Sequence, residues 1–455
     1  MGLFTTLLNT AGSIQVFTRA LNTIQNNVTN ANTPGFAKQT QTLQAMPFDT
    51  ANASGGGVQP GPILSSRSEY DEQAVRTQQS LLGESHQKAS DLATIEPLFS
   101  LTSTTGISTS LSNLFNSFSQ LSVNPSDESS RQAVINQAGA LAQSFNETAN
   151  GIGTVASNVQ QQTTQAITNI NQLTSDLAGL NKAIDASSTV ASDPSVDARV
   201  HTDLEQLSQY ADITALKQSD GTFSIYLGGQ TPLVLGDTQF QLQATSVTSQ
   251  TQILDSQGND VTEKVQNGQL GALIDENNNV IPSYMSDLNT LAQSVADQVN
   301  NTLAGGVDNN GNVPSVNLFS YNATTGAAAT LAVTSITPDQ IAAASAAAPG
   351  GNGNALAVAA LANAPVLNGA SFTEFYGNLG ARVGQDMSTA QADQTTQQDL
   401  VTQAQNQRQQ DEGVSIDEEA AQLIQFQSAY QAAGQMLAVV NSLTQTLMNI
   451  IPPQG

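Results

Sequence analysis

Two histidines are the first residues of this sequence to consider for acid–base or metal chemistry, because the chain has no cysteine and only two histidines. His201 has three acidic residues near it in the sequence, Asp197, Asp203 and Glu205. Carboxylates around an imidazole can hold a metal ion or move a proton. We favour a simpler interpretation, in which this stretch is the polar beginning of a helix. His86 lies in another polar helical stretch, where we expect it to be solvated.

The stretch from Asp308 to Asn312 has the oxygen-rich composition of a calcium loop. Its glycine comes too early and no glutamate stands at the required distance, so a turn is the better interpretation. The sequence also lacks the short motifs of zinc proteases, serine hydrolases and nucleotide-binding loops. We therefore expect no enzyme activity, no catalytic residue, no cofactor and no metal site.

The charge of the chain limits its partners. Only 12 residues are basic and 37 are acidic, which gives a net charge of −25, and charged residues make up only 11% of the 455 residues. Binding to nucleic acid needs clustered lysine and arginine, and so does docking on an anionic membrane. We expect neither partner, and the polar surface must consist mainly of uncharged side chains.

The first 28 residues have apolar side chains every three or four positions, the period of one face of a coiled coil. Asparagines and a Thr-Pro-Gly sequence follow, and proline forces the residue before it out of the helical conformation. We predict a helix that ends in a fixed turn. The N-terminal seam comprises Leu7, Ala11, Ile14, Phe17, Leu21, Ile24 and Val28, and the signature turn comprises Asn27, Asn30, Asn32, Thr33, Pro34, Gly35 and Phe36.

The C-terminal end has a matching pattern. Gly413 interrupts the preceding helix, and Ser415 with Glu418 forms the sequence of a capping box. The three acidic residues 417–419 fall in the first turn, where the helix dipole favours negative charge. The C-terminal seam that follows comprises Ile416, Ala420, Leu423, Phe426, Tyr430, Leu437, Val440 and Leu447.

Neither terminal helix has the charged outer face that usually meets water. Both could be ordinary helices of a core, but chain ends usually fray, and these faces are made of small, uncharged residues. We therefore favour self-assembly, in which other copies of the chain cover the two seams. In a free monomer the seams would be partly unpaired and the ends mobile.

Two long motifs at opposite ends resemble the signatures of the bacterial flagellar axial proteins. The first runs from Ala20 to Phe36 and the second from Gly413 to Ala432. Hook and rod proteins of this group would be mainly β between these motifs, whereas this chain is mainly helical there. Internal stretches at residues 114–118, 124–127, 131–134, 141–145, 283–300 and 341–345 resemble the hook-associated protein 1 (FlgK) family.

The resemblance implies a structural subunit at the junction between hook and filament, located in the extracellular flagellum. Its implied partners are other copies, the hook protein, the next hook-associated junction protein and an export chaperone at the C-terminal helix. It also implies secretion through the flagellar export system without a cleaved signal peptide. Two alternatives remain open: another hook or rod component, and a surface adhesin that binds through a β tip.

The fold class predicted is mainly α, with terminal coiled-coil helices, an elongated antiparallel helical bundle and a small inserted antiparallel β domain. We expect residues 1–35 with 414–455 to form the assembly domain and 36–200 with 283–413 the bundle. The period changes to two between Tyr210 and Pro282, so we place the β domain at 201–282, at the outer tip. We expect residues 36–68 to be extended and 342–353 to form a mobile surface segment.

Overall fold

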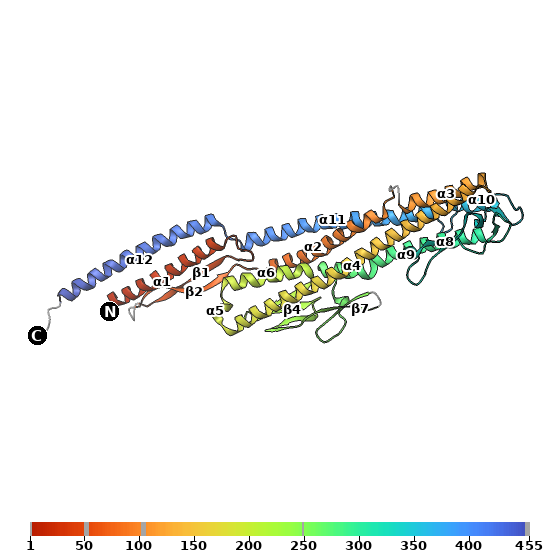
Figure 1. Ribbon diagram of the computed structural model, residues 1–455. Helices are drawn as coiled ribbons and strands as arrows, with labels where there is room; N and C mark the ends of the chain where they lie inside the picture. Colours follow the sequence, from red (N-terminus) through yellow and green to blue (C-terminus); the bar gives the residue numbers. More distant parts are fainter. Residues whose placement is uncertain (1, 50–53, 102–105, 248–249, 451–455) are drawn as a thin grey trace.

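The chain folds into a long rod built mainly from α-helices (Figure 1), which confirms the predicted fold class. The computed structural model describes residues 2–49, 54–101, 106–247 and 250–450. None of the helices in these ranges is long and apolar enough to cross a membrane. The long helices are α1 (Gly2–Asn30), α2 (Glu69–Ile95), α3 (Ile107–Val123), α4 (Glu128–Ala186), α6 (Pro194–Tyr210), α8 (Ile281–Ala304), α11 (Phe372–Glu412) and α12 (Ile416–Ile450).

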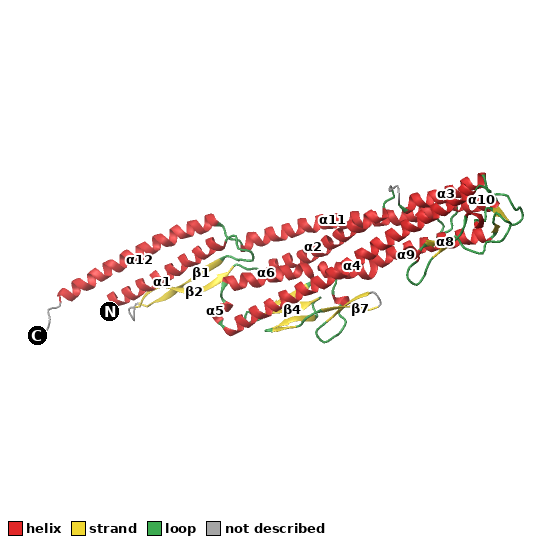
Figure 2. Cartoon of the chain, viewed as in Figure 1, coloured by secondary structure: helices red, strands yellow, loops and turns green. Residues whose placement is uncertain are grey.

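Shorter elements connect these helices, and Figure 2 shows that the strands gather at a few places along the rod. The short helices are α5 (Ser188–Ala191), α7 (Gly268–Asp275), α9 (Ala327–Thr330) and α10 (Gly353–Ala360), and a π-helical turn spans Glu276–Val280. The strands are β1 (Gln39–Asp49), β2 (Ser54–Ser65), β3 (Ile213–Lys217), β4 (Phe223–Leu227), β5 (Thr231–Leu235), β6 (Thr238–Gln239), β7 (Gln243–Val247), β8 (Gln250–Leu254), β9 (Gly306–Val307), β10 (Phe319–Ser320), β11 (Ala332–Val333) and β12 (Ala344–Ser345).

The shaft of the rod is the predicted helical bundle. Helix α2 lies against α11, and α3, α4 and α8 pack toward the far end (Figure 1). Helix α4 is one element of 59 residues, and its apolar side chains, three or four positions apart, are buried in the bundle. Burial of each large apolar side chain stabilises the fold by about 1.5–3 kcal/mol. The buried set on α4 includes Val134, Ala138, Leu141, Phe145, Ile152, Val155, Val159, Ala166, Ile170, Leu177 and Ile184.

The inserted β structure lies along the side of the shaft, beside α4, and not at the outer tip (Figure 1). Strands β3 to β6 form one antiparallel sheet in chain order, and β7 and β8 form a separate hairpin. The strands end at Leu254, and the residues from Gly268 to Pro282 are helical, so the β region is shorter than predicted. Apolar residues of β4 and β5 face α4, which explains why the sheet lies flat on the bundle.

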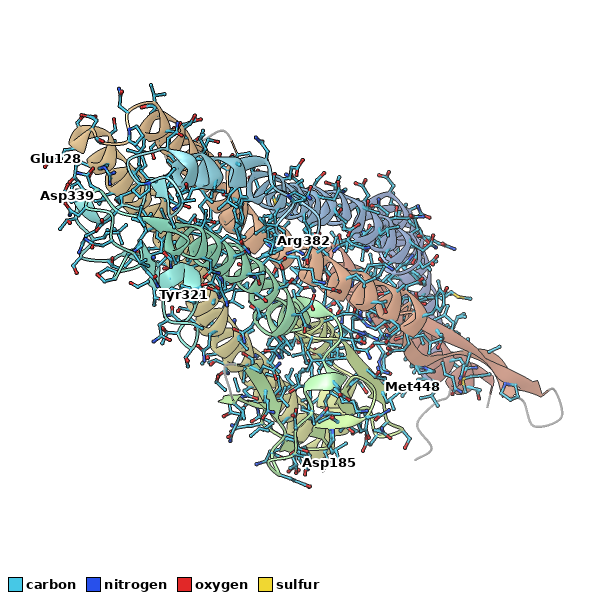
Figure 3. All side chains as sticks on the ribbon, turned by 90° about the vertical axis from the view of Figure 1, so that its right-hand side faces the viewer. Glu128, Asp185, Tyr321, Asp339, Arg382 and Met448 are labelled. Atoms are coloured by element: carbon cyan, nitrogen blue, oxygen red, sulfur yellow. The ribbon has the colours of Figure 1, made fainter. Side chains whose placement is uncertain are left out.

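The far end of the rod is closed by short strands and α10 (Figures 1 and 2). Figure 3 shows Glu128 and Asp339 together at this end. Buried Arg131 donates from Nη1 to the carbonyls of Pro338 and Ile341 and holds this loop to α4. The prediction of a mobile surface segment at 342–353 is wrong at its start, because Ala342, Ala343 and Ala344 are buried and β12 pairs with β9.

The opposite end contains both chain termini. Helix α1 packs on α12 along one face and on the β1–β2 hairpin along another (Figure 1). Residues 39–65 are therefore not merely extended: they pair antiparallel from Gln39↔Ser65 to Asp49↔Ser54 and belong with the terminal helices rather than with the bundle. We call α1, α12 and this hairpin the terminal unit.

Asparagines fix the strands to the helices in this charge-poor chain. In each case one side-chain amide donates to the backbone carbonyl of a residue in a strand or directly before one, and accepts from the N–H of the same residue, as a neighbouring strand would. In the described parts of the chain five asparagines do this: Asn27 to Gln39, Asn171 to Leu242, Asn181 to Phe223, Asn278 to Thr251 and Asn300 to Phe319. The abundant amide side chains therefore satisfy strand edges that would otherwise be unpaired.

Candidate assembly interface

The two predicted seams meet each other within one chain. The rings of Phe17 and Phe426 lie with their centroids 6.3 Å apart. Farther along, Leu21 and Val28 of α1 line a groove of about 430 Å³ together with Ile416 and Leu423 of α12. Helices α1 and α12 of one chain therefore pack on each other.

This pairing covers the seams only in part. Ile24 and Val440 are buried, and seven further residues are half-buried, Leu7, Ile14, Phe17, Leu21, Leu423, Phe426 and Leu437. Six remain exposed, Ala11, Val28, Ile416, Ala420, Tyr430 and Leu447. Other apolar residues of α12 are also exposed: Ile424, Met436, Val439, Leu443 and Met448. An unpartnered apolar surface of this kind is typical of an interaction site.

Asn27 connects the three elements of the terminal unit. Its buried side chain, on α1, forms hydrogen bonds with both backbone groups of Gln39, the first residue of β1. Its Nδ2 also donates to Oε2 of Glu419 on α12 over 3.1 Å. Glu419 is fully buried, and the Nζ of Lys38 lies 3.7 Å from its carboxylate. Asn27 was predicted as part of a turn; the structure places it inside the helix as a polar link.

The rest of the signature turn joins the terminal unit to the shaft. The N–H of Thr33 donates to the carbonyl of Asn30, and the N–H of Phe36 donates to that of Thr33, while Asn32 and Pro34 are exposed. Gly35 has φ +71°, and a Cβ there would lie 2.4 Å from the carbonyl oxygen of Ala198 on α6. Only glycine allows this backbone to come so close to the shaft.

A buried ionic cluster lies directly behind this turn. The guanidinium of Arg67 donates to Glu72 on α2, to Asp197 on α6 over 2.7 Å and to the carbonyl of Gly35 over 2.6 Å. Arg408 on α11 donates to Glu72 over 3.1 Å and to Glu205 over 2.8 Å. These charged hydrogen bonds tie three shaft helices to the signature turn.

The pKa values of two carboxyl groups in this cluster are shifted in opposite directions. Burial disfavours the ionised form of Glu72, but His201, Arg67 and Arg408 surround it and hold its pKa well below the ordinary value. Burial raises the pKa of Glu412 to about 7, and the charge of Glu72 adds to this effect. Glu412 ends α11, and its side chain accepts from the N–H of Ser68, so it closes the joint on the other side.

The residues considered for chemistry lie at separate places in the structure. His201 is completely buried within α6, whereas the prediction was the polar beginning of a helix. Its Nδ1 lies 3.5 Å from Glu72 and its Nε2 3.9 Å from Asp197, and Asp203 and Glu205 point to other partners. His86 is exposed. Asp308 accepts from the N–H groups of Asn310 and Asn312, which is the predicted turn. Among the described residues no group of three or more potential ligands could hold a metal ion.

Sequence reasoning missed the ionic cluster and the hairpin. Arg67 and Glu72 lie only five residues apart, but Glu412 is 345 residues from Arg67, so no local spacing connects the whole cluster. One signal could have indicated the cluster: in a chain with few charges, Arg67 lies just before α2 and Arg408 lies near the end of α11. For the hairpin, the glycine-rich stretch between two runs of alternating residues was the available indication.

The comparisons with known proteins agree with this arrangement. A family model described as "Flagellar hook-associated protein FlgK helical domain" matches residues 92–319, half of the chain. Flagellar hook-associated protein 1 of Bacillus subtilis (strain 168) is 27% identical over 94% of this chain and 95% of its own length. The protein of the same name from Escherichia coli (strain K12) is 26% identical over 98% and 99%.

A solved structure, that of the flagellar hook junction protein FlgK from Burkholderia pseudomallei, shares the fold. Its TM-score to this chain is 0.68, with 18% sequence identity, and the match covers 74% of this chain and 99% of that one. The shared part is the mainly helical architecture described above.

The fold and the exposed terminal seams define a class: an axial structural protein, in which both chain ends form one assembly unit and a helical shaft projects from it. The match over residues 92–319 and the nearly full-length relatives then decide the family. The chain belongs to the family of the flagellar hook-associated protein FlgK and is a structural protein of the hook–filament junction. It is therefore part of the flagellum outside the cell.

Proposed function

We propose that this junction subunit assembles through its terminal helices, α1 and α12, which pack against the terminal helices of other copies. The observation that carries the proposal is the apolar surface that remains on α12 after it has paired with α1. Burying such side chains against a neighbour removes apolar area from water and offsets the ordering of the chain ends. The assembly residues are those of the N-terminal and C-terminal seams.

The neighbours at the two ends of the junction follow from the same surface. We propose that the hook protein contacts the terminal unit on one side and the next hook-associated junction protein on the other. We expect neither nucleic acid nor an anionic membrane among the partners. The apolar residues of α12 that stay exposed also need cover before assembly, which supports an export chaperone on α12 and secretion by the flagellar export system.

Two substitutions test this function. Leu423→Asp and Leu437→Asp each place a charge on the half-buried face of α12 that meets α1. We expect both variants to be absent from the flagellum and the cells not to swim, while circular dichroism shows an intact helical shaft. Gln431→Asp, at an exposed position of the same helix, is the matched control and should be incorporated. Normal swimming with both leucine variants would contradict the proposal.

A further inference from the structure

Helix α12 has a second apolar stripe besides the one that meets α1. Met436, Val439, Leu443 and Leu447 follow one another at intervals of three and four residues and are 61%, 58%, 53% and 56% exposed. The face toward α1 is a different one, because Ala433 and Val440 are buried there. Met448, next to this stripe, is 69% exposed. We call these four residues the outer stripe.

The β1–β2 hairpin also carries exposed apolar side chains. Leu43 and Ile63 share one face of the hairpin and are 45% and 53% exposed, and Met46 and Leu64 lie on its other face. In the described residues the two strands pair only with each other, so each has one free edge. Two-stranded hairpins are only marginally stable by themselves, and exposed apolar strands with free edges tend to bind another chain.

The distribution of charge indicates that the partner of both surfaces is a second copy of this chain. Residues 1–65 and 413–455 together hold 2 basic and 4 acidic residues, whereas residues 66–412 hold 10 basic and 33 acidic residues. The shaft therefore carries −23 of the net −25, and no charged residue occurs after Glu419. Identical acidic chains repel one another along their shafts, and only the nearly neutral terminal units can come into contact. A basic partner would instead be attracted to the shaft.

The two surfaces belong to different faces of one terminal unit, since α12 and the hairpin contact different faces of α1 (Figure 1). A contact between unlike surfaces repeats from copy to copy and builds rings or helical arrays, whereas a contact between like surfaces stops at a dimer.

We propose that the outer stripe of α12 in one subunit packs on the β1–β2 hairpin of the next subunit. The inference rests on the proposed function, because it names the surfaces by which the terminal units join. Within one subunit α12 stays paired with α1, and between subunits the adjoining side of α12 meets the neighbouring hairpin. One chain thus provides both halves of a contact that continues around the junction.

Disulfide cross-linking tests the contact directly, because the chain contains no cysteine. The double variant Leu43→Cys with Val439→Cys and each single variant would replace the natural protein in cells, and isolated flagella would be oxidised. We expect the double variant to give a ladder of covalent multimers on denaturing gels and each single variant to stay monomeric. A second pair, Ser157→Cys with Val439→Cys, puts one thiol on the exposed shaft and should give no ladder.

The outcomes separate this inference from the proposed function. If the double variant is present in isolated flagella but forms no multimers, the contact is overturned while assembly through the terminal helices stands. If Val439→Cys by itself gives dimers as efficiently as the double variant, α12 meets α12 and the contact is also overturned. If the unsubstituted chain is missing from isolated flagella, the proposed function fails and the inference fails with it.

Discussion

Asn27 and Glu419 form a hydrogen bond between the two ends of the chain: Nδ2 of Asn27 donates to Oε2 of Glu419 over 3.1 Å across 392 residues of sequence. Both side chains are buried. The same amide also bonds the backbone of Gln39, so one side chain sets the register among α1, α12 and the hairpin. The pairing of the termini is therefore specified by polar contacts as well as by apolar seams.

Asn27→Ala removes all these bonds and leaves the carboxylate of Glu419 buried without its donor. We expect the pairing of α1 with α12 to lose about 1–3 kcal/mol, because an unsatisfied buried polar group costs that much. Hydrogen exchange should quicken in residues 2–30 and 416–450 and stay unchanged in α4. Asn22→Ala, at an exposed position of α1, should change neither region; equal effects from both variants would show that Asn27 has no special role.

Gly35→Ala should detach the terminal unit from the shaft. The added methyl group would meet the carbonyl of Ala198 at 2.4 Å, and the positive φ is unfavourable for alanine. Gly153→Ala is the matched control, since it lies within α4 with nothing within 4 Å and should stabilise the shaft by about 0.5–1 kcal/mol. Small-angle scattering should show a broader range of shapes for Gly35→Ala only. An unchanged scattering profile would mean that this contact does not hold the two parts together.

Arg67→Ala should destabilise the joint by about 3–5 kcal/mol, because Glu72 is buried and would lose its closest cation. Chemical denaturation followed by circular dichroism measures this loss. Arg382→Ala removes another arginine from an ion pair, with Asp287 at 2.7 Å, but both side chains there are partly exposed. That variant should lose no more than about 1 kcal/mol. Similar losses in the two variants would argue against a buried cluster at the joint.

Glu276 gives a pH dependence whose direction can be derived. Its side chain is buried in the π-helical turn, and burial, followed by the nearby carboxyl of Asp91, raises its pKa to about 11. The folded chain therefore keeps the proton at pH values where the unfolded chain has lost it. The resulting stability is fully present below the ordinary carboxyl pKa and is lost as the pH rises toward 11.

Glu276→Gln should therefore stabilise the shaft increasingly as the pH rises. Glutamine has nearly the same shape but stays neutral, so we expect little change at pH 4 and a gain of about 1–3 kcal/mol at pH 8. Denaturation midpoints at the two pH values measure this difference. Glu96→Gln changes the same charge at an exposed position and should give no such trend. A loss of stability for Glu276→Gln at pH 8 would contradict the protonated state.

The helices could be predicted from the sequence because their signals are local. Apolar spacing predicted α4, and the capping sequence Ser415 to Glu418 predicted the start of α12 at Ile416. The sequence also showed that the chain ends are apolar and nearly free of charge. Periodicity within one segment is enough for such statements, since each helix forms its own backbone hydrogen bonds.

The contacts between distant segments could not be predicted from the sequence and became evident only in the folded chain. Asn27 bonds Gln39 and Glu419, Arg67 bonds residues of α2 and α6, and the β insertion lies beside α4 instead of at the tip. These contacts join residues far apart in sequence, and their partners are single polar side chains without any period. The seam of α12 likewise divides into an inner and an outer stripe only once α1 occupies one of its sides, because a helix presents all its faces until a neighbour covers one.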